Sequence, residues 1–324
     1  MDLNARIYVA GHLGLAGSAI FRRLRAGGYR NLVTRSQAEL DLTDAPAVKA
    51  FFKSEKPEYV LIAAAKVGGI LANNTYPAEF IQINLAIQTN VIHEAWRIGV
   101  KRLLFLGSAC IYPRECPQPI KEEYLLTGPL ESTNRAYAIA KISGVEMCRS
   151  YNQQYGAKYL AVMPTNLYGP GDNYDLENSH VLPALIRKMH EAKARDLDRV
   201  VIWGTGSPRR EFLYSDDLAD ACVMMMNLPD DAFHELLQGP NGMPLINVGC
   251  GEDQTIANLA RTVASVIGFR GALEFDTAKP DGTPRRKLDI SRLHRLGWAP
   301  RVDLKSGIAA AYEDFLSREG TFRK

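Results

Sequence analysis

Residues 6–17 read Arg-Ile-Tyr-Val-Ala-Gly-His-Leu-Gly-Leu-Ala-Gly, an apolar run followed by three glycines that are three residues apart. The apolar run predicts a strand, and residues 15–25 have the spacing of a helix. In such a turn Gly11 permits a tight exit from the strand, Gly14 lets the backbone approach a pyrophosphate, and Gly17 allows close helix packing. The helix N-terminus also attracts negative charge. We therefore expect a dinucleotide site, with a purely structural glycine turn as the alternative.

The second predicted strand, residues 31–34, ends at Arg35. A site selective for NAD tends to place Asp or Glu here, against the ribose hydroxyls, whereas an arginine can accommodate the 2′-phosphate of NADP. A solvated surface arginine is the alternative interpretation. The sequence thus favours NADP(H), and we expect Asp41 and Leu42 to border the adenine.

Strand and helix patterns alternate through the first half of the chain. Apolar strand patterns occupy residues 6–10, 31–34, 59–65, 103–106 and 159–163, and long helical patterns occupy 77–97 and 137–154. Such alternation predicts right-handed crossovers, and hence an α/β fold built on a doubly wound parallel Rossmann sheet. We expect residues 1–170, with segments near 211–250, to form the NADP-binding domain. Residues 171–324 should mainly form a smaller, interleaved substrate domain.

Composition excludes several classes of function. The 324 residues are 46% hydrophobic and 23% charged, and the net charge of +3 is too small to indicate binding to nucleic acid. Five scattered cysteines have neither the pairing of a disulfide framework nor the spacing of a metal site. No stretch approaches the length of a membrane span. We expect a cytoplasmic protein without a metal ion.

Three residues suggest chemistry on a carbonyl group. Ser108 follows the apolar run 103–106, and the carboxyl end of such a strand is where ligands bind in open α/β sheets. Tyr137 and Lys141 are four residues apart, so they share one face of a helix, where an ammonium can lower the pKa of the phenol. Alone, this pair is also typical of a solvated helix face. The strand-end serine and the upstream glycine turn favour a reductase site.

Several stretches together resemble one known family. They are residues 63–70, 73–78, 107–113, 164–170, 178–184, 210–213 and 279–284, and the glycine spacing is also similar. Over almost its whole length the chain resembles the extended short-chain dehydrogenase/reductases. Within that family it looks most like the GDP-L-fucose synthases, which are GDP-4-keto-6-deoxy-mannose 3,5-epimerase/4-reductases.

The resemblance implies a role for each matching residue. Ser108, Tyr137 and Lys141 become the reductase triad, and Cys110 and His180 become the epimerisation pair. The implied GDP-sugar contacts are Lys188, Trp203, Arg210 and Asp281. The expected cofactor contacts are Gly11, Gly14, Leu15, Gly17, Arg35, Asp41, Leu42, Leu106, Gly107, Lys141, Pro164, Asn166, Leu167 and His180. The resemblance further implies a homodimer through the helices at 77–97 and 137–154.

Some points stay open on the sequence alone. A free cysteine such as Cys110 is often a small buried hydrophobe, and a histidine beside a helix start, like His180, is often structural. Which of the two serves as base and which as acid at C3 and C5 is not fixed, because a helix N-terminus disfavours a cationic histidine. Leu13 and Gln37 stand where the family pattern has arginines, which leaves Arg35 as the partner of the 2′-phosphate.

Related enzymes and one non-enzymatic class compete with this interpretation. A nucleotide-sugar dehydratase would carry an Asp-Glu pair just beyond the strand-end hydroxyl, where this chain has Ala109 and Cys110. A UDP-sugar 4-epimerase is a further rival, and a GDP-colitose-type synthase would differ in few residues. An NADP-sensing regulator could keep the glycine turn and lose the triad, but Ser108, Tyr137 and Lys141 are all present.

Overall fold

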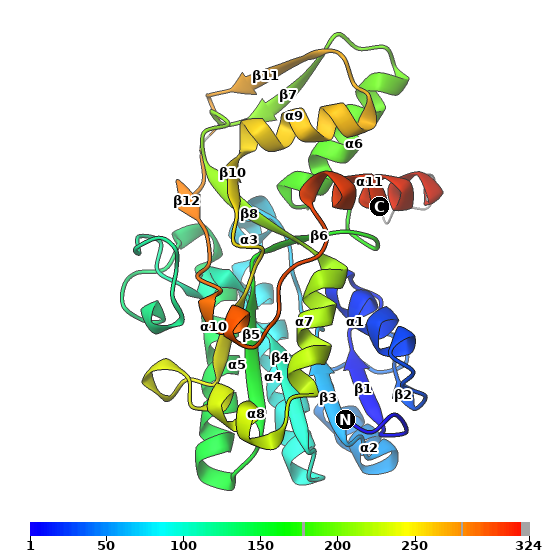
Figure 1. Cartoon of the computed structure of the whole chain (residues 1–324), viewed down its shortest axis with the longest axis vertical. Coiled ribbons are helices and arrows are strands. Elements are labelled where there is room, and N and C mark those ends of the chain that lie inside the picture. The colour runs from blue at the N-terminus through cyan, green and yellow to red at the C-terminus, as the bar shows by residue number, and fades with distance from the viewer. Residues whose placement is uncertain (177–178, 280, 319–324) are drawn as a thin grey trace.

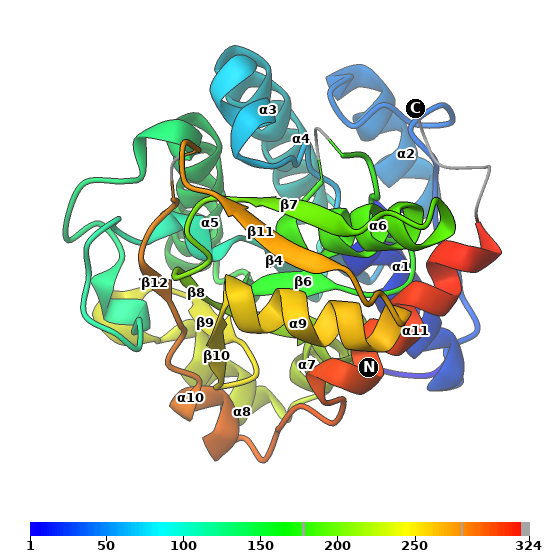
Figure 2. The same cartoon turned by 90° about the horizontal axis from the view of Figure 1, so that it is seen from above.

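The computed structural model describes residues 1–176, 179–279 and 281–318 of the chain. Asn178 and Pro280, which belong to two of the stretches that carry the resemblance, lie outside these residues. The described chain forms a larger part around a parallel sheet and a smaller part stacked on one end of that sheet (Figure 1). Seen from above, β7, β11 and α9 of the smaller part lie over the sheet (Figure 2).

The large sheet has six strands in the order β2-β1-β3-β4-β5-β9, and every neighbouring pair is parallel. Its strands are β1 (Ile7–Ala10), β2 (Leu32–Val33), β3 (Tyr59–Ile62), β4 (Arg102–Leu106), β5 (Tyr159–Pro164) and β9 (Leu245–Val248). The chain passes from β1 to β2 on one side and returns to β3 on the other, so strand order reverses at β1. This reversal is the switch point at which doubly wound sheets bind ligands. The predicted fold class is confirmed.

Helices cover both faces of this sheet. One face packs against α1 (Leu15–Ala26), α7 (Ser215–Met226) and α8 (Asp230–Leu237), and the other against α2 (Ala45–Glu55), α4 (Pro77–Arg97) and α5 (Arg135–Tyr155). Residues of β1 alternate accordingly, because Ile7 and Val9 enter the first core whereas Tyr8 and Ala10 enter the second. Because both faces of the sheet are buried, the sequence of each central strand is a near-continuous run of apolar residues.

The smaller part is built from short strands and three helices around a third core. Its strands are β6 (Asn166–Tyr168), β7 (Arg199–Trp203), β8 (Arg209–Tyr214), β10 (Asp253–Thr255), β11 (Ala272–Asp276) and β12 (Arg285–Arg286), and its helices are α6 (Val181–Ala194), α9 (Ile256–Ile267) and α11 (Leu304–Ser317). Between these segments, α7, α8 and β9 return to the large sheet, so the chain crosses between the two parts several times. The domain limits proposed from the sequence remain predictions.

Short elements complete the chain. They are α3 (Ile70–Thr75), α10 (Ser291–Arg295) and the 3-10 helices η1 (Ala109–Ile111), η2 (Glu122–Tyr124), η3 (Ser132–Asn134) and η4 (Pro240–Gly242). No helix among the described residues is long and apolar enough to cross a membrane. β6 pairs in parallel with β8, which fixes the smaller part against the carboxyl end of β5. The carboxyl edge of the sheet thus lies where the two parts meet.

Candidate functional site

The glycine turn at the carboxyl end of β1 has the close backbone contacts that its sequence predicts. Gly11 has a φ of +83°, and a Cβ there would lie 2.6 Å from the Ala64 nitrogen. A Cβ on Gly17 would lie 2.1 Å from the Gly11 carbonyl oxygen. Gly14 caps α1 without a side-chain hydrogen bond, and a Cβ on it would meet only the Gly11 oxygen, at 3.5 Å. The first amides of α1 are therefore free of a side-chain cap, beside space that a phosphate can enter.

A buried histidine nitrogen adds to this turn. The Nδ1 of His12 is buried and has no hydrogen-bond partner among the described residues. Because buried polar atoms are nearly always paired, such an atom calls for a ligand or water. The glycine pattern concerns positions 11, 14 and 17 and does not indicate a role for position 12, so the sequence analysis missed His12. The turn and this nitrogen fit a dinucleotide.

Arg35 follows β2 and is held in place by three contacts. Its Nη2 donates to Glu55 Oε1 at 2.5 Å, its Nη1 donates to the Thr34 carbonyl at 2.7 Å, and its guanidinium lies 5.5 Å from the Phe51 ring centre. Glu55 also pairs with Arg6, so one carboxylate serves two arginines. Positive charge therefore remains at the end of β2.

Two further residues of the expected adenine border lie beyond β2. Asp41 is exposed, and its carboxylate accepts from the Thr43 backbone amide at 2.9 Å. Leu42 is buried in the core that faces α2 and α4.

Ser108, Tyr137 and Lys141 come together at the carboxyl end of β4. Lys141 is 3% exposed, its Nζ donates to the Leu106 carbonyl at 2.8 Å, and it lies 5.8 Å from the Tyr137 ring centre. Burial lowers the pKa of Lys141 to about 8. Next to Leu106, a Cβ on Gly107 would lie 2.1 Å from Met163 Cε, so a larger residue there would displace the end of that side chain.

The expected lowering of the Tyr137 pKa is not found. Burial raises the pKa of this phenol, a Cys110 thiolate would raise it further, and only the Ser108 hydroxyl opposes both. The reason is that the Lys141 ammonium is itself desolvated and donates to a carbonyl oxygen, so burial outweighs its charge at the phenol. Tyr137 therefore stays protonated at neutral pH.

Cys110 lies one turn beyond Ser108, in η1. The Ser108 Oγ accepts a hydrogen bond from the Cys110 amide at 3.3 Å, and the hydroxyl also lies close enough to the thiol to affect its pKa. The residue is 9% exposed. Burial raises its pKa, while the Ser108 hydroxyl, Arg286 and Lys141 act in the opposite direction. Sequence reasoning did not anticipate Arg286, which lies 176 positions after Cys110.

His180 directly precedes α6, in the smaller part. The residue is exposed, yet desolvation by surrounding protein lowers the pKa of its imidazole. Among the described residues, no hydrogen bond joins His180 to Cys110. The two proposed epimerisation residues thus come from different parts of the chain, and their pairing remains a prediction.

Trp203 at the end of β7 presents an open aromatic face. The side chain is 57% exposed, and two ammonium groups flank it: Lys188 Nζ lies 5.5 Å and Lys279 Nζ 5.4 Å from a ring centre. Lys279 was not anticipated from the sequence. Asp281 lies close by, accepting from the Thr205 amide at 2.9 Å and from the Thr205 hydroxyl at 2.7 Å.

Arg210 lies in β8, beside β12. Its Nη1 donates to the Arg209 carbonyl at 2.8 Å, and burial together with the nearby Arg286 lowers its pKa to about 10. Trp203, the two lysines, Arg210 and Arg286 provide an aromatic face and several cations, which suits a nucleotide diphosphate.

The remaining expected cofactor residues lie along the carboxyl end of β5. Pro164 ends β5, and Asn166 and Leu167 are the first two residues of β6. The Asn166 side chain donates to the Glu211 carbonyl at 2.9 Å, and Thr165 donates to the same oxygen at 3.1 Å. In this structure the Asn166 amide therefore joins β6 to β8.

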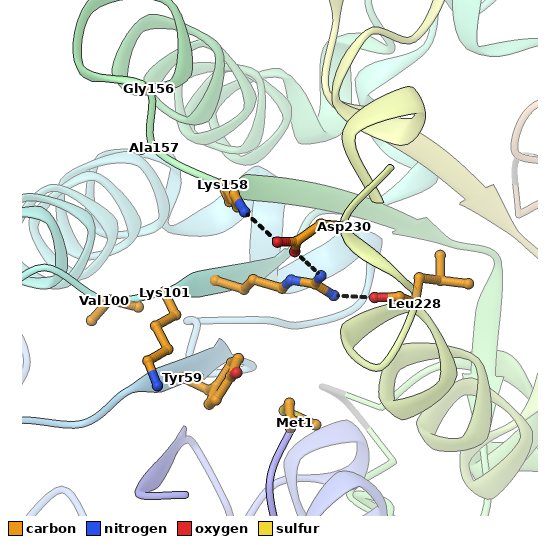
Figure 3. A pocket seen from close by; sticks show the side chains of 10 residues that line it. Met1, Tyr59, Val100, Lys101, Gly156, Ala157, Lys158, Leu228 and Asp230 are labelled. Carbon is orange, nitrogen blue, oxygen red and sulfur yellow. Dashed lines mark hydrogen bonds and ion pairs between the residues drawn. The ribbon is translucent and has the colours of Figure 1, made fainter. Parts of the chain in front are cut away.

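A surface pocket at the opposite edge of the sheet does not belong to this site. Figure 3 shows it between Lys101 and Lys158, which directly precede β4 and β5. Its charges are already paired, because Asp230 binds both Arg102, at 2.5 Å, and Lys158, at 3.1 Å. Within the described residues, no cluster of three or more His, Cys, Asp or Glu side chains could hold a metal ion.

Comparisons with known proteins agree with this geometry. The sequence profile of the NAD dependent epimerase/dehydratase family matches residues 7–238. A putative GDP-L-fucose synthase 2 from Arabidopsis thaliana is 57% identical over 316 residues, which cover 98% of this chain and 93% of that protein. A GDP-L-fucose synthase from Escherichia coli K12 is 52% identical over 321 residues, covering 98% of each chain.

More distant relatives include a different synthase and a solved structure. A GDP-L-colitose synthase from Yersinia pseudotuberculosis is 36% identical and covers 97% of this chain and 99% of that protein. The crystal structure of a GDP-L-fucose synthetase from Naegleria fowleri bound to NADP superposes with a TM-score of 0.89 at 28% identity. It covers 100% of this chain and 98% of that one.

Proposed function

The chain belongs to the NAD dependent epimerase/dehydratase family, and on that basis we propose that it converts GDP-4-keto-6-deoxy-D-mannose to GDP-L-fucose. The conversion comprises epimerisation at C3 and C5 and NADPH-dependent reduction at C4. The observation that carries the proposal is the clustering of Ser108, Cys110, Tyr137 and Lys141 at the carboxyl end of β4. Relatives more than 50% identical over nearly the whole chain are GDP-L-fucose synthases.

NADP(H) is the cofactor, as the NADP-bound relative and the GDP-L-fucose synthases support. The amides at the start of α1 and the cation Arg35 would hold its phosphates, and the buried Nδ1 of His12 would find a partner there. When bound, the cofactor supplies the hydride for C4. The protein's own part in this step is to hold the ketone and deliver a proton.

Tyr137 delivers that proton. Because burial keeps the phenol protonated at neutral pH, it is an acid rather than a base before reduction. The Ser108 hydroxyl donates to the substrate oxygen O4 and polarises the carbonyl. Lys141 stays largely cationic at pH 7, holds the ribose of the cofactor, and stabilises the phenolate that forms when the proton leaves.

Cys110 and His180 perform the epimerisations. The C4 ketone acidifies the protons on C3 and C5, so one group breaks a C–H bond and takes the proton while the electrons move onto O4 as an enolate. The other group returns a proton from the opposite face of the ring. Cys110 must be a thiolate to act as the base. The lowered pKa of His180 favours the neutral imidazole, which can also accept a proton.

Substrate recognition falls to the smaller part. Trp203 stacks on the guanine with its exposed face, and Lys188, Arg210 and Asp281 contact the rest of the nucleotide sugar. The arginine fork suits the diphosphate.

The assembly we propose is a homodimer through α4 and α5, in the cytoplasm. These two helices pack along each other, and at one end they carry an aromatic cluster in which Trp96 and Tyr155 stack at 4.3 Å. Tyr155 is 45% exposed, which leaves apolar surface for a second copy. The five cysteines are all free, as in a reducing compartment. Equilibrium sedimentation tests the dimer, and a monomer at micromolar concentration would contradict it.

The function is tested by incubating the protein with GDP-4-keto-6-deoxy-mannose and NADPH in heavy water and identifying the sugar product. We expect GDP-L-fucose with deuterium at C3 and C5. Cys110→Ser should lower deuterium incorporation by about 10² to 10⁴ while leaving slow reduction of the unepimerised ketone. Tyr137→Phe should nearly abolish NADPH oxidation while isotope exchange continues. Cys116→Ser, a matched loss of a half-buried thiol, should alter neither.

Two outcomes would contradict the proposal. Wild-type incorporation of deuterium in Cys110→Ser would make that thiol a packing residue. A clear preference for GDP-4-keto-3,6-dideoxy-mannose would favour the colitose-type alternative, which the 36% identical relative represents.

A further inference from the structure

Two Arg-Arg pairs lie side by side where β8 and β12 meet. The strands run parallel with Arg209 opposite Arg285 and Arg210 opposite Arg286. Successive side chains of a strand point to opposite faces, so each face of this small ladder receives one arginine from each strand. The four cations thus form two pairs, one on each face, and the two pairs differ in their ion-pair partners.

The first pair shares one carboxylate. Arg209 and Arg285 both bind Asp253, whose side chain is 5% exposed, at 3.1 Å and 2.6 Å. These contacts hold the pKa of Asp253 at about 2. This face of the ladder is a satisfied structural cluster, which ties β8 to β10 and β12.

The second pair has no such carboxylate. Among the described residues, neither Arg210 nor Arg286 forms an ion pair, and Arg286 helps to lower the pKa of Arg210, as expected of neighbouring like charges. Asp281 lies near enough to Arg210 to oppose this effect, but its oxygens accept from Thr205. Two guanidinium groups kept together without an ion-pair partner mark a place for negative charge, which a bound diphosphate can supply beside Arg210 and a thiolate can supply beside Arg286.

Arg286 also reaches across to the loop that carries the thiol. Its Nη1 donates to the Ala109 carbonyl at 2.7 Å, which is the peptide group directly before Cys110. This bond spans 177 positions of the chain and fixes η1 against β12. The charge of Arg286 is therefore held beside the one cysteine of the candidate site.

We propose that Arg286 is a positioning residue for Cys110 that stabilises the thiolate form of this side chain. The inference rests on the proposed function, in which Cys110 acts as a base. As the thiolate takes a proton from C3 or C5, the S–H bond forms, the C–H bond breaks, and the negative charge moves from sulfur to O4. A fixed guanidinium beside η1 stabilises the charge on sulfur before this transfer.

Three other groups face the thiol. The Ser108 hydroxyl can donate to the thiolate, Lys141 is a second cation, and Tyr137 faces the thiol from α5. Lys141 is itself desolvated, and its ammonium donates to the Leu106 carbonyl. The Ser108 hydroxyl, Arg286 and Lys141 all oppose the effect of burial on the thiol pKa. An opposite charge at close range typically lowers a pKa by about one to three units.

The test follows the alkylation of Cys110 by iodoacetamide as a function of pH, quantified by mass spectrometry of the peptide that contains it. Arg286→Met should move the midpoint of this profile upward by about one pH unit or more, which lowers the alkylation rate about tenfold below the midpoint. Arg286→Lys should restore most of the shift. Arg285→Met, which removes an arginine from the face that holds Asp253, should leave the midpoint unchanged.

A uniform fall of the Arg286→Met rate at every pH, with an unchanged midpoint, would overturn the proposal, because a purely structural anchor alters access and not charge. Deuterium exchange at C3 and C5 provides a second profile, and it should shift in the same direction. An unchanged profile with only a higher KM for the GDP-sugar would make Arg286 a substrate contact alone. The alkylation assay needs no sugar, so its failure is distinct from failure of the proposed function.

Discussion

Two glycines of the nucleotide turn should respond to alanine in opposite ways. A Cβ on Gly17 would lie 2.1 Å from the Gly11 carbonyl oxygen and 2.6 Å from its carbonyl carbon, both backbone atoms that cannot rotate away. A Cβ on Gly14 meets only one atom, at 3.5 Å, and Gly14 has φ −84° and ψ 168°, which alanine adopts without strain. Gly17→Ala should therefore damage the fold, and Gly14→Ala should damage only cofactor binding.

The magnitudes follow from these contacts. In Gly17→Ala the helix α1 must move by roughly 1 Å to reach ordinary contact distance, and such overpacking costs about 1–3 kcal/mol. Replacing a helical glycine by alanine stabilises by about 1 kcal/mol, so the net loss of stability is about 0–2 kcal/mol. Gly14→Ala should change stability little, because the gain of about 0.4–1 kcal/mol from restricting the unfolded chain is offset by the poor N-cap preference of alanine at the start of α1. Its methyl group enters the space where we place the pyrophosphate, so NADPH affinity should fall at least about tenfold.

The assay is thermal unfolding of the cofactor-free proteins at one fixed concentration, with NADPH affinity measured separately by calorimetry. Unfolding without cofactor matters because a ligand that binds only the folded state would add its own stabilisation. A Gly17→Ala protein that melts at the wild-type temperature would show that Gly17 and the Gly11 carbonyl lie farther apart than in the structure. Wild-type NADPH affinity in Gly14→Ala would refute the assignment of the turn to the cofactor.

Three further predictions concern charge. Arg35→Ala should raise the KM for NADPH about 10- to 100-fold, which corresponds to the loss of one charge-assisted hydrogen bond, and should leave the KM for NADH unchanged. If steady-state kinetics show equal increases in both KM values, Arg35 has no role in cofactor selectivity. Arg210→Ala should weaken GDP binding in calorimetry by about tenfold or more, and Trp203→Ala by a smaller factor, whereas unchanged GDP affinity would move the nucleotide site elsewhere. Burial raises the pKa of Asp172 to about 7, so the folded protein holds this proton more tightly than the unfolded chain, and stability is lost as the pH rises between about 4 and 7. Asp172→Asn should therefore raise the melting temperature at pH 8 and not at pH 4, and an equal effect at both would exclude titration as the cause.

The sequence predicts the large sheet well because each of its signals is local. Strands such as β4 and β5 are buried on both faces and read as apolar runs, and the glycine turn follows β1 directly. It predicts β2 less well, since only Leu32–Val33 forms a ladder where residues 31–34 were expected. The sequence analysis missed helix α7. Nine of its residues are buried against the sheet, so its polar first turn and three successive methionines do not show the one-sided apolar pattern of a surface helix.

The catalytic candidates divide in the same way. Tyr137 and Lys141 were placed together because they are one helical turn apart, and Ser108 because it follows a predicted strand. The role of Cys110 came only from the family resemblance. The direction of the Tyr137 pKa was wrong, because burial depends on everything that packs around the phenol and not on the spacing to one lysine. His12 was missed because only the structure shows that its Nδ1 is buried and unpaired.

Arg209, Arg210, Arg285 and Arg286 show where sequence reasoning ends. In the sequence the two Arg-Arg pairs look the same. In each pair, the two side chains point to opposite faces of the strand. Only the parallel register of β8 and β12 decides that Arg209 and Arg285 share Asp253 while Arg210 and Arg286 face the site. That register depends on β8 being held by β6 and β10, which come from segments far apart in the chain. A cofactor turn can be read from twelve consecutive residues, whereas the charge beside Cys110 exists only because distant strands bring Arg286 to it.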